Sequence, residues 1–504
     1  MLRRPGDGSR LFVDKPLAWI RERPVSALHR VFAAAALAAV AACSGERPVK
    51  TLLLFTMESV RADDVSAAHY GWATTDTTPP EYGGNFPPAL PEDLDDLARS
   101  GIRFAQAFAP SGSPFPSLVA LHSGRPPEEL GVYNEYSRLT GVSTLAELLS
   151  LRGVRCGAFV RRKALAPPCG LERGFGTYVA CDKDDQLVLE AHVWLRSMRL
   201  AAPDRPIFLW IHLSNPSPPY QPAWEYRKVI CPDADPAAGT LEELEQFAKS
   251  PVLRTQERRR TVHGLHAASV LQGSDAAQVF LETARPLLGR YESTTMIFAG
   301  TNGDQLGARG PFGGLGSLRD AALHVPLFYW SQDTAGRPKV AAPVVELYDI
   351  TRTIAARFDC DPPEGSSGRD LMKLLDDPSS RDYVAFASWE NRVFAARALR
   401  ERLICDPLRV APGGWPGDST SAVPEELYDE PTDPEESVNL ALSASSSLER
   451  MRAHLTRLRA SVRPAPPVDE TDPARIEAIR RERIHGEPGH PATPIPAGTC
   501  GERP

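Results

Sequence analysis

The chain has 504 residues, which is too long for one compact core and favours a large domain with a smaller one beside it. Hydrophobic residues make up 42% of the chain and charged residues 24%, the proportions of an ordinary globular protein. The net charge of -7 provides no basic footprint, so we expect no nucleic-acid partner.

Residues 1–43 are typical of a targeting segment. Arginines at 21, 23 and 30 precede the apolar run 31–42, which is too short to span a bilayer but suits a signal peptide. The tetrapeptide Val-Ala-Ala-Cys that ends at Cys43 resembles the bacterial lipobox, whose cysteine becomes lipidated. We therefore expect a lipoprotein-type signal peptide and a chain attached to a membrane of the bacterial cell envelope through a lipid on Cys43. This places it on the periplasmic or outer-membrane face; plain secretion is the alternative.

Strands alternate with helices in the predicted N-terminal domain, residues 44–380. The predicted strands are 51–57, 102–104, 156–160, 206–213, 294–299 and 325–330, and the predicted helices are 94–99, 144–151 and 276–288. Such alternation favours an α/β architecture with a mainly parallel sheet. Functional residues of these sheets lie at the carboxyl ends of strands, which is where Glu58, His212 and Thr301 fall.

The remaining segments differ in composition. The charged segment 231–264 suggests a solvated, helix-prone insertion. Residues 381–462 contain strand-like runs and a helix from about 446, which predicts a small C-terminal subdomain. From 463 to 504, Pro, Glu and Arg dominate without periodicity, which predicts a disordered tail. Cys169 and Cys181 are close enough in sequence to pair, but spacing does not settle disulfide connectivity.

Five segments, taken in order, resemble the sulfatase family of the alkaline phosphatase superfamily. They are F-T-M-E-S-V-R-A-D-D at 55–64, L-D-D-L-A-R-S-G-I-R-F-A-Q-A-F-A-P at 94–110, G-L-E-R-G-F-G-T-Y at 170–178, G-S-L-R-D-A-A-L-H-V-P-L at 316–327 and E-L-Y-D-E-P-T-D-P-E-E-S-V-N-L at 426–440. The resemblance implies an alkaline-phosphatase/sulfatase-like three-layer sandwich with a mainly parallel sheet, plus a small C-terminal α+β subdomain.

The resemblance also implies a particular chemistry. Sulfatases hold a divalent cation, usually Ca²⁺, with oxygen ligands, and the cation polarises the ester and orients the nucleophile. The nucleophile is a formylglycine made from Cys or Ser, and Lys and His side chains stabilise the charged oxygens and protonate the leaving group.

The nucleophile segment is recognisable in S-P-F-P-S-L-V-A-L-H-S-G-R at 113–125, but its reactive residue is replaced. Pro114 occupies the nucleophile position and Leu118 the position of the following arginine. Proline has no side-chain oxygen or sulfur with which to attack. Ser113 and Ser117 are candidate substitutes, although a turn residue and a helix cap are the structural interpretations of these two serines.

The metal positions are altered too. Glu58 aligns with the first metal aspartate and is one methylene longer, and Thr301 stands where a second aspartate is lost. Asn302 matches an accepted ligand, and Asp304 lies nearby as a partial replacement. Glu58, Asn302 and Asp304 are therefore the candidate metal ligands, and we expect Ca²⁺ binding to be weak or absent.

The residues that should act on the leaving group are also changed. His212 aligns with a family histidine, for which a structural hydrogen bond is the alternative to catalysis, and Ser217 stands at the catalytic-histidine position. The segment 312–316 has neither His nor Lys near the position of the family's later basic residue. Arg61 and Asp63 suggest a structural ion pair, and Asp320 and Asp349 suggest residues that support the fold.

Three functions are compatible with this pattern. The first is a catalytically impaired or inactive sulfuric-ester hydrolase homologue, a pseudoenzyme, that binds a partner or a sulfated or phosphorylated ligand at the old cleft. The second is an active metal-dependent sulfate or phosphate ester hydrolase with non-standard residues. The third is a structural envelope protein. The sequence does not reveal the oligomeric state.

Overall fold

The computed structural model describes residues 50–65, 94–253, 255–288, 294–308, 312–314, 316–331, 334, 337, 339–406 and 424–481. The predicted signal peptide, Cys43 and residues 482–504 lie outside these ranges. Within the described part of the chain, no helix combines the length and apolar character that crossing a membrane requires.

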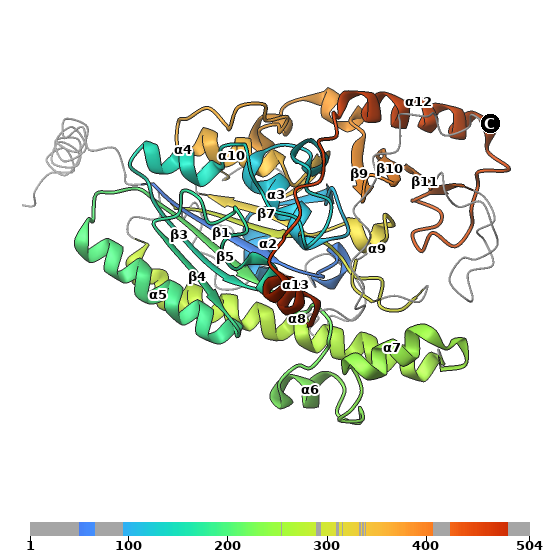
Figure 1. Cartoon of the computed structure of the whole chain (residues 1–504), viewed down its shortest axis with the longest axis horizontal. Coiled ribbons are helices and arrows are strands. Elements are labelled where there is room, and N and C mark those ends of the chain that lie inside the picture. The colour runs from blue at the N-terminus through green and yellow to red at the C-terminus, as the bar shows by residue number, and fades with distance from the viewer. Residues whose placement is uncertain are drawn as a thin grey trace, which may run out of the picture. The chain divides into compact units, whose positions relative to one another are not determined.

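An eight-stranded sheet forms the centre of the fold, in the order β4-β3-β5-β1-β6-β7-β2-β8 (Figure 1). Its strands are β1 (Thr51–Met57), β2 (Ile102–Phe108), β3 (Arg155–Arg161), β4 (Thr177–Cys181), β5 (Ile207–Leu213), β6 (Thr294–Gly300), β7 (Leu327–Ser331) and β8 (Val340–Glu346). Strand pairs are parallel except those that β7 makes with β6 and β2. The predicted α/β class with a mainly parallel sheet is therefore confirmed.

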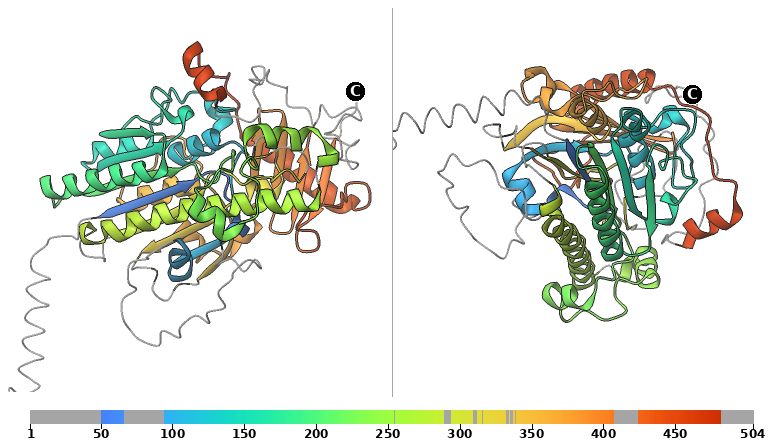
Figure 2. Two further views of the ribbon diagram at one scale, coloured as in Figure 1. Left: turned by 90° about the horizontal axis from the view of Figure 1, so that it is seen from below. Right: turned by 90° about the vertical axis from the view of Figure 1, so that its left-hand side faces the viewer.

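Helices cover both faces of this sheet, as the right-hand view of Figure 2 shows. One face carries α3 (Pro114–Ser123), α4 (Leu145–Leu151), α10 (Asp349–Arg357) and α11 (Leu371–Leu374). The other face carries α2 (Leu94–Ser100), α5 (Asp184–Ala201) and α8 (Gln256–Ala284). The side chains of strand β1 alternate between the two faces. Leu52 and Leu54 pack on the face that carries α3, whereas Leu53, Phe55 and Met57 pack on the face that carries α8. A continuous apolar run thus supplies both faces of a buried strand.

The predicted C-terminal subdomain is a separate four-stranded antiparallel sheet, in the order β12-β11-β10-β9. Its strands are β9 (Ala385–Trp389), β10 (Val393–Arg397), β11 (Glu401–Cys405) and β12 (Glu425–Asp429), and helix α12 (Ser445–Ser461) packs on them. Asp320, the first residue of α9 (Asp320–Leu323), forms buried ion pairs with Arg397 and Arg402 of this sheet. Asp349, which begins α10, pairs with Arg369. Both aspartates support the fold, as predicted.

The prediction of a disordered tail from residue 463 is wrong for residues 463–481. This segment runs from α12 to α13 (Pro473–Arg481), drawn in dark red in Figure 1. Backbone amides of Ala465 and Val468 donate to the carbonyl oxygens of Glu128 and Gly131. Arg475 donates to the carbonyl oxygen of Ala164 at 2.9 Å. Main-chain hydrogen bonds order a proline-rich segment whose composition lacks a periodic apolar pattern.

The interpretation of 231–264 as a solvated insertion is also corrected. Helix α7 (Leu241–Lys249) and the first turns of α8 bury a cluster of apolar side chains. Its members are Tyr220, Leu244, Phe247, Ala248, Val262, Leu265, Leu306 and Phe312. Helix α6 (Trp224–Ile230) precedes this layer. Through Leu306 and Phe312 the cluster packs close to Asp304, which belongs to the candidate site.

The described cysteines at 156, 169, 181, 231 and 360 are free thiols, and Cys405 is disulfide-bonded. Cys169 and Cys181 are therefore not joined to each other.

Candidate functional site

Neighbouring parallel strands end at one edge of the sheet, and the candidate residues lie there. Strands β3, β5, β1 and β6 are consecutive in the sheet and parallel (Figure 1). Arg162 directly follows β3, Glu58 directly follows β1, and Asn302 lies just beyond β6. Because the carboxyl ends of parallel strands meet at the same edge, residues distant in sequence come into contact here.

Glu58 is the centre of the site, and three donors surround its buried carboxylate. His212 Nε2 lies 3.0 Å from Oε1, and the Ser217 hydroxyl donates to Oε2 at 2.7 Å. The Arg162 guanidinium lies 2.9 Å from Oε2. Burial raises the pKa of Glu58, but the charge of Arg162 and the hydrogen bond from His212 outweigh burial and hold this pKa below its ordinary value. Glu58 is therefore a buried carboxylate neutralised by the protein itself.

A chain of hydrogen bonds orients His212. Trp210 Nε1 donates to the Thr56 hydroxyl at 2.8 Å, and that hydroxyl lies 2.8 Å from His212 Nδ1. Thr56 accepts from Trp210 and can give its own proton to Nδ1, which leaves the Nε2 proton of His212 for Glu58. His212 is fully buried. This arrangement matches the structural role that the sequence offered as the alternative to catalysis.

Pro114, at the nucleophile position, is the first residue of α3. The first helical turn tolerates proline because its amide has no partner within the helix. Ser113, the preceding residue, does not cap the helix with its side chain; its hydroxyl donates instead to Glu135 Oε1. The same Glu135 oxygen accepts from the backbone amide of Phe115 at 3.0 Å. A carboxylate therefore lies against the residues on either side of the nucleophile position.

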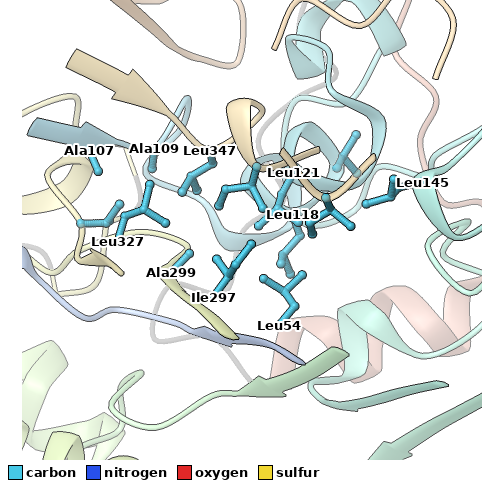
Figure 3. Close-up of a cluster of buried hydrophobic side chains, with 14 of the residues drawn as sticks. Leu54, Ala107, Ala109, Leu118, Leu121, Leu145, Ile297, Ala299, Leu327 and Leu347 are labelled. Carbon is cyan, nitrogen blue, oxygen red and sulfur yellow. The ribbon is translucent and has the colours of Figure 1, made fainter. Parts of the chain in front are cut away.

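Ser117 is not a helix cap. It lies inside α3, fully buried, and its hydroxyl donates to the Ser111 carbonyl oxygen at 3.0 Å. Leu118, at the position of the family arginine, is buried in the layer between α3 and the sheet. Figure 3 shows Leu118 and Leu121 facing Leu54 of β1 and Ile297 of β6. Leu118 therefore contributes to the hydrophobic core and not to an anion site.

The other candidate metal ligands are occupied by donors of the protein. Asn302 Oδ1 accepts from the Ser59 amide and from the Thr301 hydroxyl, each at 3.2 Å. Asp304 accepts from the Tyr220 hydroxyl at 2.6 Å and from the amides of residues 306 and 313 at 2.8 Å. Burial raises the pKa of Asp304 above its ordinary value despite these donors and the nearby His266.

These donors decide whether the residues fit a divalent cation. Ca²⁺ takes six to eight oxygen ligands that must be free to face it. The oxygens of Glu58, Asn302 and Asp304 face N–H and O–H groups, and Arg162 already places a positive charge beside Glu58. Within the described ranges, no group of three or more His, Cys, Asp or Glu side chains is arranged to hold a metal. The site therefore does not fit the family's metal.

Sequence reasoning missed four residues of this network: Arg162, Glu135, Tyr220 and His266. Arg162 Nη2 lies 3.9 Å from Glu135 Oε2, so the guanidinium lies between Glu135 and Glu58. His266 Nε2 is 2.9 Å from the Ser59 carbonyl oxygen. Only Arg162 carried a signal in the sequence, because it lies two positions beyond the predicted strand 156–160. The pair Arg61–Asp63 was predicted and is present, with Nη2 to Oδ2 at 2.5 Å.

This fold and these positions define a protein of the alkaline phosphatase superfamily. The family model described as Sulfatase matches residues 50–360. The chain therefore belongs to the sulfatase family.

Solved structures show the same fold. A protein in complex with its substrate D-glucosamine-2-N,6-O-disulfate matches at 14% identity and a TM-score of 0.63, over 82% of this chain and 98% of its own. The phosphonate monoester hydrolase of Agrobacterium radiobacter matches at 18% identity and a TM-score of 0.63, over 82% and 96%. A putative sulfatase from Bacteroides fragilis matches at 15% and 0.63, over 83% and 97%. Among curated proteins, no relative matches the chain.

Proposed function

We propose that this chain is a non-hydrolytic member of the sulfatase family that acts by binding a ligand or partner at its old cleft. The observation that carries the proposal is Pro114 at the first position of α3, where the family has its nucleophile. Ser217 at the catalytic-histidine position and the paired carboxylate of Glu58 support it. Covalent catalysis needs an activated side-chain nucleophile, and proline supplies none.

A sulfated or phosphorylated compound is the first ligand class to test, because one structural neighbour is described with a disulfated glucosamine as its substrate. The Glu135 carboxylate already lies against the N-terminus of α3, where it would repel such an anion. We therefore propose that the ligand binds outside this buried network. Binding there predicts a thermal shift or a calorimetric signal with glucosamine disulfate that weakens as salt is added.

Activity assays test the loss of turnover directly. The protein is incubated with 4-nitrophenyl sulfate, 4-nitrophenyl phosphate and a phosphonate monoester, with Ca²⁺ and with a chelator. We expect no release of 4-nitrophenol above that of a Glu58→Ala variant under either condition. Ca²⁺-dependent hydrolysis that disappears in Ser113→Ala would overturn the proposal.

One observation favours an active hydrolase as the second candidate. The Ser113 hydroxyl donates to the Glu135 carboxylate, which is the contact that a nucleophile makes with its base. Ser113 is only 1% exposed, however, so a substrate cannot reach it in this conformation. A structural envelope role is the third candidate, and a pull-down from native envelopes with the intact protein would distinguish it by returning no specific ligand or partner.

We also propose that the mature chain begins at Cys43 and carries a lipid there, on the basis of the lipobox-like tetrapeptide. Mass spectrometry of the N-terminal peptide from bacterial expression should show the mass of a diacylglycerol-modified cysteine, and Cys43→Ser should release the protein from the membrane fraction. An unmodified N-terminus after cleavage would instead indicate plain secretion.

A further inference from the structure

The family's metal does not fit this site, and the network shows what replaces it. We propose that the chain carries internal substitutes for both ionic ligands of the family centre: the Arg162 guanidinium in place of the divalent cation, and the Glu135 carboxylate in place of the substrate anion. The inference rests on geometry and stands whether or not the protein binds an external ligand.

The first half rests on the position of Arg162. It lies at the carboxyl edge of the sheet, 2.9 Å from Glu58, the residue at the first metal position. The two side chains are 13% and 1% exposed, so their charges interact with little screening by water. A buried carboxylate at this position needs a positive partner, because an uncompensated buried charge is costly. A guanidinium provides one positive charge and directional donors, whereas Ca²⁺ provides two charges and demands many oxygens.

The second half rests on the position of Glu135. Helix N-termini favour anions, because their first amides lack partners and carry partial positive charge. Helix α3 has 10 residues, and Glu135 accepts from its Phe115 amide at 3.0 Å. The Ser113 hydroxyl adds a second donor to the same oxygen. Glu135 is 2% exposed, so its carboxylate is built into the site and is not a passing surface contact.

Arg162 joins the two halves. Its guanidinium lies between Glu58 at 2.9 Å and Glu135 at 3.9 Å. In a metal-dependent hydrolase the cation lies between its protein ligands and the anionic substrate. Here one arginine and one glutamate reproduce that order of charges within a single chain. The C-terminal segment 463–481 contacts the chain next to both residues. The Glu470 amide donates to the carbonyl oxygen of Tyr136, beside Glu135, and Arg475 donates to the carbonyl oxygen of Ala164, near Arg162.

The experiment removes Arg162 or Glu135 and measures whether the ion that each is proposed to replace, a cation or an anion, then binds. The full-length protein, Arg162→Ala and Arg162→Ala/Glu58→Gln are titrated with CaCl₂ and, separately, with methylguanidinium chloride, with NaCl at matched ionic strength as reference. Melting temperature is the readout, with isothermal calorimetry for Ca²⁺. Arg161→Ala is the matched control, because Arg161 is the neighbouring arginine, at the end of β3, but pairs with Asp184.

We expect the melting temperature of the wild-type protein to be insensitive to millimolar Ca²⁺ and to chelator. Arg162→Ala should melt several degrees lower and regain part of that loss with Ca²⁺ or methylguanidinium. The double variant should melt higher than Arg162→Ala, and its melting temperature should not respond to either cation. In the Arg161→Ala control, any response of the melting temperature to a cation should not depend on Glu58.

Glu135 is tested in the same way with anions. Glu135→Ala should regain stability with millimolar sulfate or phosphate by more than wild type does, whereas Glu135→Gln, which keeps an acceptor for Phe115, should not. The proposal is overturned if the wild-type protein binds Ca²⁺ stoichiometrically through Glu58. It is also overturned if Arg162→Ala is as stable as wild type, or if neither reopened site responds to its ion.

Discussion

Replacing Arg162 by methionine removes the cation beside Glu58 and keeps a side chain of comparable reach. Breaking a buried pair by removing one partner costs about 3–5 kcal/mol, because the remaining charge is buried without compensation. Glu58 keeps its contacts with His212 and Ser217, so we expect a loss near the lower end of that range, about 3 kcal/mol at pH 8. Glu58→Gln/Arg162→Met should recover most of this loss, because neither buried charge remains.

The pKa of Glu58 determines whether the stability rises or falls with pH. The pKa of Glu58 in the folded protein is below its ordinary value, so the pair stabilises the protein above the unfolded pKa of about 4.5 and this contribution is lost as the pH falls. In Arg162→Met burial dominates and raises the same pKa, so the variant should lose stability as the pH rises above the unfolded pKa of about 4.5. Urea unfolding of wild type, both single variants and the double variant from pH 4.5 to 8 measures the coupling. A coupling energy below about 0.5 kcal/mol at pH 8 would refute the reasoning.

Three further perturbations test the surroundings of the site. Leu118→Arg restores the family residue but places a charge in a fully buried apolar layer, so it should lower the free energy of unfolding by more than about 4 kcal/mol or prevent folding. The control Leu118→Met should cost less than about 1.5 kcal/mol. A soluble, stable Leu118→Arg variant would contradict this expectation. Burial raises the pKa of Glu128 to about 7, so the folded protein favours the protonated form of this side chain. The contribution of protonated Glu128 to stability is therefore lost as the pH rises from about 4.5 through 7. Glu128→Gln should therefore gain roughly 2–3 kcal/mol on wild type between pH 5 and pH 8 in urea unfolding, and the exposed control Glu257→Gln should gain nothing. Deleting residues 463–504 should lower the melting temperature and increase hydrogen exchange at 128–139, and unchanged exchange there would show that the C-terminal segment does not hold these loops.

Local sequence signals predicted the elements that local chemistry determines. The strand 51–57 was predicted at its observed bounds, because a short apolar run is sufficient to identify a buried parallel strand. The helix predicted at 144–151, with Ser143 or Thr144 as its cap, is α4, and Thr144 is the cap: its hydroxyl accepts from the Glu147 amide at 3.2 Å in a capping box. Both signals depend only on neighbours within a few residues.

The site required information that no local pattern contains. Glu58 and Pro114 could be placed by aligning motifs, but the partner of Glu58 could not. Arg162 is 104 positions away and reaches Glu58 only because β3, β5 and β1 are neighbours in the sheet. Glu135 lies in a loop without a motif and reaches α3 through tertiary packing. The missed partners are thus consequences of sheet order.

The same network explains why changing one residue back to its family identity should not restore turnover. A serine or cysteine at position 114 would provide a nucleophile, but the Glu135 carboxylate would still lie against the helix N-terminus where a substrate anion must bind. Removing Glu135 would admit an anion but leave Arg162 without one of its two carboxylates, and Arg162 would still hold Glu58 away from a metal. Each change is offset by the others because the charges balance only as a set. If the proposal holds, loss of the metal and loss of the substrate site are one physical change, the formation of an internal ion-pair network in their place.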